Sequence, residues 1–513
     1  MNQNLIELLK ETALKFPRKK AVIFKGKSIS YRDLVADIAR QSQRLKKINV
    51  EKGDRVGILL PNSSDFLISY FAVLNRQAIV VPLNNFLKPE ELEIILKDCR
   101  LKFLITRQEF LKTAELLKKD IESLKDYLFI DRDLTKAAPG LKAHLSDYGF
   151  SLLETQAKSS DTAVILYTSG TTGIPKGAML SHGNLLFDLF ACAKEIEVSR
   201  NDNFICMLPL FHSFPSTVCM LLPIATGATT TIVEGVRPFS KVLKAIMLYR
   251  VTVFVSVPAV YNILINIKIP KFIFWPFLRK ILFPLRVCIS GAAALQEETL
   301  KKFEERFGIP LLEGYGLTEA SPVVSFNPYR RSRIAGSIGL PLDGIEVKVV
   351  DEKGLEVKRG VTGELIIKGG NVMQGYFEKP EETREALRDG WLYSGDLARI
   401  DDEGFIYIVD RKKDMINIRG LKVYPREVEE VLCRHPAVKE AAVVGIKDEH
   451  HGEIPKAFVV LKGPIRINEH ELLRYLRIHI ASYKVPRNIE FKDNLPKTST
   501  GKILKRSLIE NIS

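Results

Sequence analysis

The sequence predicts an α/β protein built from more than one domain, and three patterns indicate this fold class. Short apolar runs alternate with helical patterns over about the first 160 residues. Residues 334–370 alternate apolar and polar positions between glycine turns, and a second series of helices and strands follows from about residue 412. At 513 residues the chain is too long for one typical domain. We therefore expect a large N-terminal domain of parallel α/β sheets with a small β subdomain, followed by a small α+β domain.

The first 160 residues have the pattern of right-handed βαβ units. Four apolar runs are short enough for buried strands: residues 21–24, 55–61, 78–84 and 102–106. Helical patterns such as that of residues 31–47 separate these runs, which predicts a mainly parallel sheet with helices on both faces. Residues 1–17 have the pattern of an amphipathic helix, and their two glutamates argue against a signal peptide.

The composition favours a cytoplasmic protein that binds anions. Six cysteines are scattered without a CxxC pair, which favours reduced thiols over a disulfide framework. No 18 uncharged apolar residues follow one another, so no membrane-spanning segment is expected. The net charge of +15 favours nucleotides, coenzyme A (CoA), an acidic carrier protein or a membrane surface. Nucleic acid is not a predicted partner, because no basic and aromatic run forms a known binding module.

One stretch concentrates positive charge. No acidic residue lies between Glu234 and Glu297, and within this stretch residues 265–286 mix basic and aromatic side chains. Two interpretations remain open for residues 265–286. They form either a helix pair that closes the core or a segment that rests on lipid headgroups as peripheral membrane contact.

A polar loop follows the apolar run of residues 163–166. Four hydroxyl residues, several glycines and Lys176 lie within residues 168–177. Glycines let backbone N–H groups approach an oxyanion, and hydroxyls and a lysine add donors and charge, so the pattern indicates phosphate binding. The loop is not a Walker A motif, because Pro175 precedes the lysine and Gly177 follows it. The alternative is an ordinary surface turn rich in Ser, Thr and Gly.

Further candidates lie downstream in the sequence. His212 is the one imidazole in the apolar stretch 207–233, where a lone histidine is either a core residue or a site residue. Residues 287–295 have the pattern of a strand that ends in a turn of small residues. Residues 313–321 offer an aromatic face, a hydroxyl and the carboxylate of Glu319, which suit adenine, phosphate and Mg²⁺. Lys502 lies beside Gly501 near a basic tail, where a lysine is commonly just exposed.

These motifs resemble those of the adenylate-forming superfamily, which includes acyl-CoA synthetases, adenylation domains of peptide synthetases and luciferases. TSGTTGIPKG (168–177) is similar to the family's phosphate-binding motif, and EGYGLTEAS (313–321) is similar to its adenine-binding motif. The segments 391–429 and 496–505 follow in the family's order, so the resemblance covers nearly the whole chain. The motif sequences are most similar to those of long-chain fatty-acid–CoA ligases.

The resemblance implies roles for individual residues. Lys502, His212, Thr168 and Glu319 are the implied catalytic residues, and Thr168 and Glu319 are the implied ligands of Mg²⁺. Tyr315 would stack on adenine, and Asp396 would accept the ribose hydroxyls with Arg411 beside it. The implied nucleotide-binding residues are Thr168, Ser169, Gly170, Thr171, Thr172, Gly173, Lys176, Gly291, Ala292, Ala293, Glu313, Gly314, Tyr315, Gly316, Thr318, Asp396, Arg411, Lys413 and Lys502.

The family's architecture implies an AMP-binding domain at residues 1–411 and a mobile C-terminal domain at residues 412–513, with Lys413 as the pivot. This chain departs from the family at Ala292 and Ala294, where a second glycine and a proline are common. It also lacks the aspartate that amino-acid-activating relatives carry near His212, which disfavours an amino acid substrate.

The resemblance implies a ligase that uses ATP, Mg²⁺ and CoA to convert a fatty acid, through acyl-AMP, into acyl-CoA, AMP and pyrophosphate. Several alternatives stay open: an acyl carrier protein as acceptor, an aryl or medium-chain acid as substrate, a scaffold without catalysis, and a luciferase-like oxidase. The sequence does not size the acyl pocket, and it does not distinguish a monomer from a homodimer.

Overall fold

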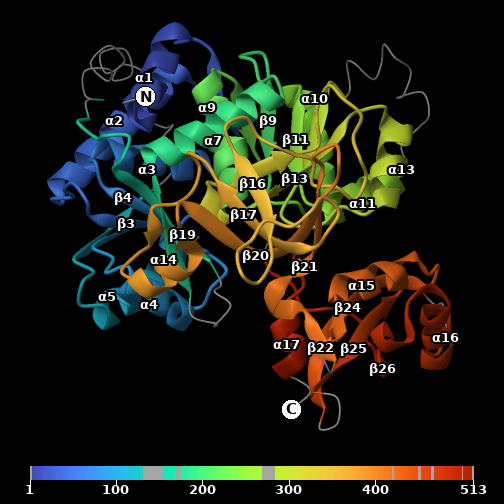
Figure 1. Ribbon diagram of the computed structural model, residues 1–513. Coiled ribbons are helices and arrows are strands. Elements are labelled where there is room, and N and C mark those ends of the chain that lie inside the picture. The colour runs from blue at the N-terminus through green and yellow to red at the C-terminus, as the bar shows by residue number, and fades with distance from the viewer. Residues whose placement is uncertain are drawn as a thin grey trace. The chain divides into compact units, whose positions relative to one another are not determined.

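The computed structural model describes residues 3–130, 153, 155–168, 175–267, 283–418, 421–448, 452–463, 467–498 and 501–510 (Figure 1). The chain divides into two compact units. Unit 1 comprises Met1–Glu346 and Ile367–Leu392, and unit 2 comprises Val347–Ile366 and Tyr393–Ser513. The α/β fold class predicted from the sequence is confirmed.

Unit 1 contains a nine-stranded sheet with the order β15-β14-β13-β12-β11-β9-β10-β1-β2. Its six inner strands, from β13 to β1, run parallel, and antiparallel strands complete both edges. Buried parallel strands consist of continuous apolar runs, because both faces of the sheet are covered. The strands are β1 (Lys20–Phe24), β2 (Lys27–Ser30), β9 (Asn203–Cys206), β10 (Thr229–Ile232), β11 (Val253–Ser256), β12 (Val287–Ser290), β13 (Leu311–Gly316), β14 (Val323–Phe326) and β15 (Leu340–Pro341).

A second sheet in unit 1 has seven strands in the order β18-β8-β7-β4-β3-β5-β6. The segment from β7 to β6 is parallel, whereas β8 and β18 join in antiparallel register. The apolar runs predicted as neighbours thus divide between two sheets, since residues 21–24 pair with β10 instead. The strands are β3 (Arg55–Ile58), β4 (Ile79–Pro82), β5 (Phe103–Thr106), β6 (Asp126–Phe129), β7 (Thr162–Thr168), β8 (Lys176–Ser181) and β18 (Gly375–Tyr376).

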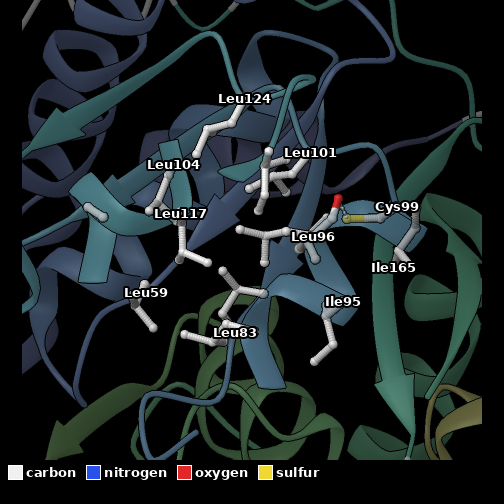
Figure 2. Close-up of a cluster of buried hydrophobic side chains, with 14 residues drawn as sticks. Leu59, Leu83, Ile95, Leu96, Cys99, Leu101, Leu104, Leu117, Leu124 and Ile165 are labelled. Carbon is white, nitrogen blue, oxygen red and sulfur yellow. Dashed lines mark hydrogen bonds between the residues drawn. The ribbon is translucent and has the colours of Figure 1, made fainter. Parts of the chain in front are cut away.

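Helices cover these sheets, and their ends follow capping rules. The predicted N-terminal helix is present, and Asn4 and Glu7 form its capping box. Leucines and isoleucines of α4 and α5 pack with Leu104 and Ile165 in one core cluster on the seven-stranded sheet (Figure 2). The helices are α1 (Leu5–Lys15), α2 (Tyr31–Lys47), α3 (Ser64–Asn75), α4 (Pro89–Asp98), η1 (Gln108–Phe110), α5 (Leu111–Asp120), α7 (His182–Glu195), α8 (Ser213–Pro215), η3 (Ser216–Leu221), α9 (Leu222–Thr226), α10 (Phe239–Tyr249), α11 (Pro258–Asn266), α13 (Glu297–Phe307), η5 (Thr318–Ala320) and α14 (Pro380–Ala386).

A five-stranded sheet corresponds to the predicted β subdomain. Its order is β16-β17-β20-β19, and β21 pairs with β20 in antiparallel register. The strands are β16 (Glu346–Val350), β17 (Gly363–Lys368), β19 (Leu387–Arg388), β20 (Trp391–Ile400) and β21 (Ile406–Arg411).

The C-terminal part of unit 2 is a small α+β fold, as predicted. Its sheet has the order β23-β22-β25-β24, and β26 joins β25 in parallel. One face of the sheet packs on α15 and α16 through an apolar cluster that includes Leu432, Val443 and Leu476. The elements are η6 (Lys412–Asp414), β22 (Ile416–Ile418), β23 (Leu421–Val423), α15 (Pro425–Arg434), β24 (Val438–Asp448), β25 (Gly452–Leu461), α16 (Glu469–His479), η7 (Ser482–Lys484), β26 (Asn488–Phe491) and α17 (Lys505–Glu510).

Candidate active site

The two ends of the predicted phosphate loop lie side by side. Thr168 ends β7 and Lys176 begins β8, and the two residues are paired across the antiparallel ladder. The Thr168 hydroxyl donates to the Lys176 carbonyl at 3.5 Å. The predicted loop residues Ser169, Gly170, Thr171, Thr172 and Gly173 lie outside the described residues. The hairpin therefore fixes where the loop begins and ends.

Tyr376 connects this hairpin to the predicted metal ligand Glu319. It lies on β18, opposite Ala178 of β8, and the Lys176 ammonium is 5.3 Å from the centroid of its ring. The Tyr376 hydroxyl donates to Glu319 Oε1 at 2.9 Å. Burial, and then the charge of Glu319, raise the pKa of Tyr376 above its ordinary value. The phenol therefore keeps its proton and donates a hydrogen bond to the carboxylate. A base, an aromatic ring and an acid from three elements thus form one contact chain.

The segment around Glu319 is fixed by its backbone. The Glu319 carbonyl accepts from Met373 N–H at 2.8 Å, and the Thr318 and Ser213 hydroxyls lie 3.3 Å apart. A Cβ at Gly316 would lie 2.0 Å from the carbonyl oxygen of Pro322, so the close approach of these chains requires glycine here. The structure therefore brings Thr318 and Glu319 to the end of β13, near the hairpin that carries Lys176.

Glu313 holds the turn of small residues in place. Its side chain is buried, and Oε1 accepts from Leu295 N–H at 2.9 Å. Gly291 donates its N–H to the Ser256 carbonyl at 3.1 Å. Ala292 follows in the left-handed region with φ of 67°, a conformation that glycine adopts more readily. The predicted residues 291–293 and 313 thus form one connected turn.

His212 lies beside this turn. Its Nδ1 accepts from Phe214 N–H at 3.4 Å, which caps α8. The Phe214 ring packs on Gly291, where a Cβ would lie 2.8 Å from Phe214 Cζ. His212 is half-buried and lies in the sequence directly before Ser213, which contacts Thr318. The predicted site residues of unit 1 are therefore linked through direct contacts or short stretches of chain.

Unit 2 carries the predicted ribose-binding pair. Asp396 on β20 faces Arg411 on β21, and Asp396 Oδ1 lies 3.1 Å from Arg411 Nε. The Asp396 carboxyl is buried, and the Arg411 side chain is half exposed. The backbone N–H of Asp396 donates to the Ser394 hydroxyl at 3.1 Å. The pair therefore has a fixed backbone and a cation that can reach solvent.

Two described segments, residues 497–498 and 501–503, pair with each other, and we call this pairing the Lys502 hairpin. The Lys502 carbonyl accepts from Thr498 N–H at 2.8 Å, and its N–H donates to the Thr498 hydroxyl at 3.1 Å. Lys497 and Ile503 pair as an antiparallel bridge, and Ile503 packs on the apolar cluster around Phe458. The backbone of Lys502 is thus held while its side chain is exposed.

Lys505 anchors the chain just after this hairpin. Its Nζ lies 2.7 Å from Glu429 Oε1 of α15. Burial disfavours the charged ammonium, but the charges of Glu429 and Asp410 outweigh it and raise the pKa of Lys505. The ion pair fixes the start of α17, and therefore the end of the Lys502 hairpin.

The oxygen donors of unit 1 fit the predicted Mg²⁺. Among the residues that the structure describes, no three His, Cys, Asp or Glu side chains gather to hold a metal ion. Mg²⁺ commonly takes only one or two protein carboxylates and completes its shell with phosphate oxygens and water. One carboxylate, Glu319, and one hydroxyl, Thr168, match that requirement.

Sequence reasoning missed three residues that organise these sites: Tyr376, Ser213 and Lys505. Tyr376 follows Gly375 in a two-residue strand that is too short to give a periodic signal. Ser213 adjoins the predicted His212, and Lys505 lies within the quoted segment 496–505, so only their contacts distinguish them. Over the described parts of the chain, no helix is both long and apolar enough to cross a membrane.

Comparison with known proteins places this arrangement in a family. The pattern of the family described as "AMP-binding enzyme" matches residues 9–377, and that described as "AMP-binding enzyme C-terminal domain" matches residues 427–502. A protein of Bacillus subtilis (strain 168) named long-chain-fatty-acid–CoA ligase is 37% identical over 99% of this chain and 94% of its own length.

Solved structures agree with this placement. The ATP-bound crystal structure of MatB from Rhodopseudomonas palustris superposes with a TM-score of 0.89 at 29% identity, and covers 100% of this chain and 99% of that one. The o-succinylbenzoate CoA synthetase MenE from Bacillus subtilis, in complex with ATP and magnesium, gives a TM-score of 0.84 at 28% identity, over 99% and 100% of the two chains. With both family patterns in order and relatives matched over nearly their full length, this chain belongs to the AMP-binding enzyme family, the adenylate-forming enzymes.

Proposed function

We propose that this protein is a long-chain fatty-acid–CoA ligase that forms an acyl-AMP intermediate and then acyl-CoA. The observation that carries the proposal is the contact chain from Lys176 through Tyr376 to Glu319. This contact chain begins at the paired residues Thr168 and Lys176, which border the Thr/Gly loop. It brings together a cation, a hydroxyl donor and a carboxylate, which are groups that suit the binding of a nucleoside triphosphate with Mg²⁺, and it therefore supports the proposal. Relatives named fatty-acid–CoA ligases support the choice of acid and thiol.

In the first half-reaction, a carboxylate oxygen of the fatty acid attacks the α-phosphorus of ATP, and the bond to pyrophosphate breaks. Two anions approach each other, so the rate depends on positive charge and donors at the developing negative charge. Lys502, Lys176 and the hydroxyls of Thr168 and Thr318 supply these groups. Mg²⁺, which Glu319 and Thr168 would hold, neutralises part of the phosphate charge when bound.

Other residues orient the nucleotide and the acid. Tyr315 offers a face for adenine, and the pair Asp396 and Arg411 receives the ribose. The turn of Gly291, Ala292 and Ala293, held by Glu313, lets the nucleotide lie against backbone. We assign His212 to the border of the acyl group, as the family resemblance implies. It caps α8 two residues before Phe214, which packs on that turn.

In the second half-reaction, the sulfur of CoA attacks the acyl carbon, the bond to AMP breaks, and the thiol proton is released. AMP is a good leaving group, so this step needs chiefly positioning and a path for the thiol. We assign residues 412–513 to a domain that pivots at Lys413 and brings Lys502 to the site for the first half-reaction only.

Pyrophosphate release across a series of acids tests the proposal. Acetate, oleate and coumarate are compared, each with and without CoA. A long-chain ligase releases pyrophosphate fastest with oleate and forms its thioester only when CoA is present. Preference for coumarate or a medium-chain acid contradicts the assigned substrate, and release without any acid preference contradicts the assigned reaction.

Single-turnover transfer distinguishes CoA from an acyl carrier protein as the acceptor of the acyl group. Preformed acyl-AMP is offered to the enzyme with CoA or with the phosphopantetheine form of an acidic carrier protein. Carrier proteins are acidic and would suit the net charge of +15. Faster transfer to CoA supports the ligase, and faster transfer to the carrier makes the enzyme an acyl carrier protein synthetase.

We assign peripheral membrane contact to α10. Its exposed face carries Lys241, Lys244, Met247 and Leu248, and the side chain of Leu248 is 60% exposed. Basic and apolar side chains on one helix face match an anionic lipid surface. Segment 265–286, the earlier candidate, lies mostly outside the described residues. We expect the protein to sediment with vesicles that contain anionic lipid. The double variant Lys244→Ser with Leu248→Ser should bind these vesicles more weakly. Equal binding to neutral vesicles contradicts the assignment.

A further inference from the structure

Asp98 connects β7, which leads into the phosphate loop, with the turn that follows β18, although it lies in none of the motifs. It is the last residue of α4. One carboxylate oxygen accepts from the Tyr167 hydroxyl at 2.6 Å, and the other lies 2.6 Å from the Lys379 ammonium. The side chains of Asp98 and Lys379 are only 20% and 18% exposed, so water screens this pair little.

Each partner of Asp98 leads directly to a site residue. Tyr167 precedes Thr168 on β7, and its ring packs on Gly177, where a Cβ would lie 3.0 Å from Tyr167 Cζ. Lys379 follows Tyr376 by three residues, and its N–H donates to the Tyr376 carbonyl at 3.2 Å. Asp98 is therefore bonded on one side to the strand of Thr168 and on the other to Lys379, in the turn between β18, whose tyrosine holds Glu319, and α14.

The position of Asp98 is electrostatically unfavourable without these partners. A carboxylate at the C-terminal end of a helix faces the negative end of the helix dipole. Burial first, and then the neighbouring Cys99 and Asp98, raise the pKa of Tyr167, so its hydroxyl stays a donor. The two charge-assisted bonds compensate for the unfavourable position and are stronger than neutral ones.

The residue that follows Asp98 is packed into the core. Cys99, the next residue, is fully buried and packs in the same cluster as Ile95, Leu96 and Ile165 (Figure 2). Ile165 belongs to β7, two residues before Tyr167. The end of α4 and the strand that leads into the phosphate loop therefore share one packed core, and Asp98 lies at its edge.

We propose that Asp98 is a positioning residue for the metal and phosphate site, because it fixes the spacing between Thr168 on β7 and the Tyr376–Glu319 pair. The inference rests on the proposed function of that site. Residues that orient ligands from behind commonly change metal affinity or activity by about 10- to 100-fold when they are mutated. Asp98 would act in this way through hydrogen bonds and without touching the substrate.

The test compares Asp98→Asn with a matched control in the dependence of ATP–pyrophosphate exchange on Mg²⁺–ATP concentration. Arg100 and Glu378 form an ion pair at 2.6 Å between the same two chain segments, with side chains 64% and 45% exposed. Arg100→Met therefore removes a link between these segments but leaves Tyr167 alone. We expect Asp98→Asn to raise the half-saturating Mg²⁺–ATP concentration about tenfold, and Arg100→Met to leave it within twofold.

A second assay separates positioning from general damage. Thioester formation from supplied acyl-AMP and CoA needs no bound triphosphate, so Asp98→Asn is expected to keep its rate within about twofold. If Asp98→Asn fails to fold, Tyr167→Phe replaces it as the test variant. This variant keeps the ring on Gly177 and removes only the hydrogen bond to Asp98, so the half-saturating Mg²⁺–ATP concentration should rise by a smaller factor. Equal losses in both assays, or equal shifts in Asp98→Asn and Arg100→Met, overturn the inference. A wild-type protein without acid-dependent exchange overturns the proposed function instead.

Discussion

Two lysines of this protein, Lys176 in unit 1 and Lys502 in unit 2, are held in different ways. The Lys176 side chain is half-buried and lies against the ring of Tyr376, whose hydroxyl binds Glu319. The backbone of Lys502 is fixed by Thr498, but its side chain is exposed. One positive charge is thus built into its unit together with the acid nearby, and the other is presented on the surface of a small domain.

This difference fits the proposed division of labour between the two half-reactions. A charge that is fixed beside its partners is preorganised for the phosphates throughout the cycle. A charge on an exposed hairpin can serve one half-reaction and be withdrawn for the other. Lys505 supports this arrangement, because its ion pair with Glu429 anchors the chain three residues after Lys502, whose side chain is exposed.

The largest expected effect tests the exposed lysine. Lys502→Ala should lower acyl-AMP formation on the order of 100-fold or more, since it removes a charge that acts on the transition state. Thioester formation from supplied acyl-AMP should largely survive, as measured by CoA consumption in a single turnover. Lys497→Ala is the control, because Lys497 lies on the same hairpin and pairs with Glu440 at 2.7 Å. Equal losses in both half-reactions would refute the division of labour.

The next effect tests the fixed acid. Glu319→Gln keeps an acceptor for the Tyr376 hydroxyl but removes the negative charge that suits Mg²⁺. We expect acyl-AMP formation at low Mg²⁺ to fall about 10- to 100-fold and to recover partly at high Mg²⁺. A titration of pyrophosphate release against Mg²⁺ measures this shift. Tyr376→Phe should shift the curve less, because the carboxylate remains; an unchanged Mg²⁺ dependence in Glu319→Gln would argue against its role as a ligand.

The sequence predicted the local elements well, because their signals are local. Apolar runs such as residues 102–106 became buried strands, and the periodic pattern of residues 31–47 became α2. It did not predict that residues 21–24 would leave their sequence neighbours and pair with β10, where Phe24 lies opposite Ile232. That pairing depends on the packing of distant helices, which no short pattern encodes.

The site was predicted through resemblance, and its supports were not. Motif wording identified Lys176, Thr318 and Glu319, and the structure places these residues around one end of β8 and β13. Tyr376 and Asp98 have no such wording, since their roles arise from strand pairing and from one helix end. The boundary at residues 411 and 412 and the pivot at Lys413 stay predictions that the two half-reaction assays address.

A smaller effect is expected from acid, which should lower the stability of unit 1 through the protonation of His182. His182 is 2% exposed, and its Nδ1 accepts from Leu5 N–H at 3.3 Å. Burial, opposed in part by Asp161, lowers the pKa of His182 to about 4. The unfolded chain has a pKa near 6.5 and binds more protons between these values, so the stability that neutral His182 contributes is complete above about pH 6.5 and is lost as the pH falls towards 4.

The loss should reach about 2 kcal/mol at pH 5. Calorimetry at pH 5 and pH 7.5 measures this loss. His182→Gln should flatten the pH dependence of stability because glutamine does not titrate, and its amide oxygen can still accept from Leu5 N–H. The described histidines of unit 2, His435, His470 and His479, are half-buried or exposed, so a separate transition of unit 2 should move less. An identical pH dependence in wild type and His182→Gln would remove His182 as the cause.

The smallest expected effect lies at Ala292, where this chain differs from the wording common in its family. The residue has φ of 67°, in the left-handed region that costs a non-glycine residue about 1 kcal/mol or more. Ala292→Gly removes that cost, but glycine also gives the unfolded chain more freedom, which offsets about 0.5–1 kcal/mol. The net change should raise Tm by no more than about 2 °C in a scan.

Because the turn is held at both ends by Gly291 N–H on Ser256 and by Leu295 N–H on Glu313, the conformation should stay the same and the half-saturating ATP concentration should not change. A Tm that falls by several degrees would show that the Ala292 methyl group makes contacts worth more than the backbone cost, and a changed ATP requirement would show that the turn, unlike Lys176 and Glu319, is not fixed before the nucleotide binds.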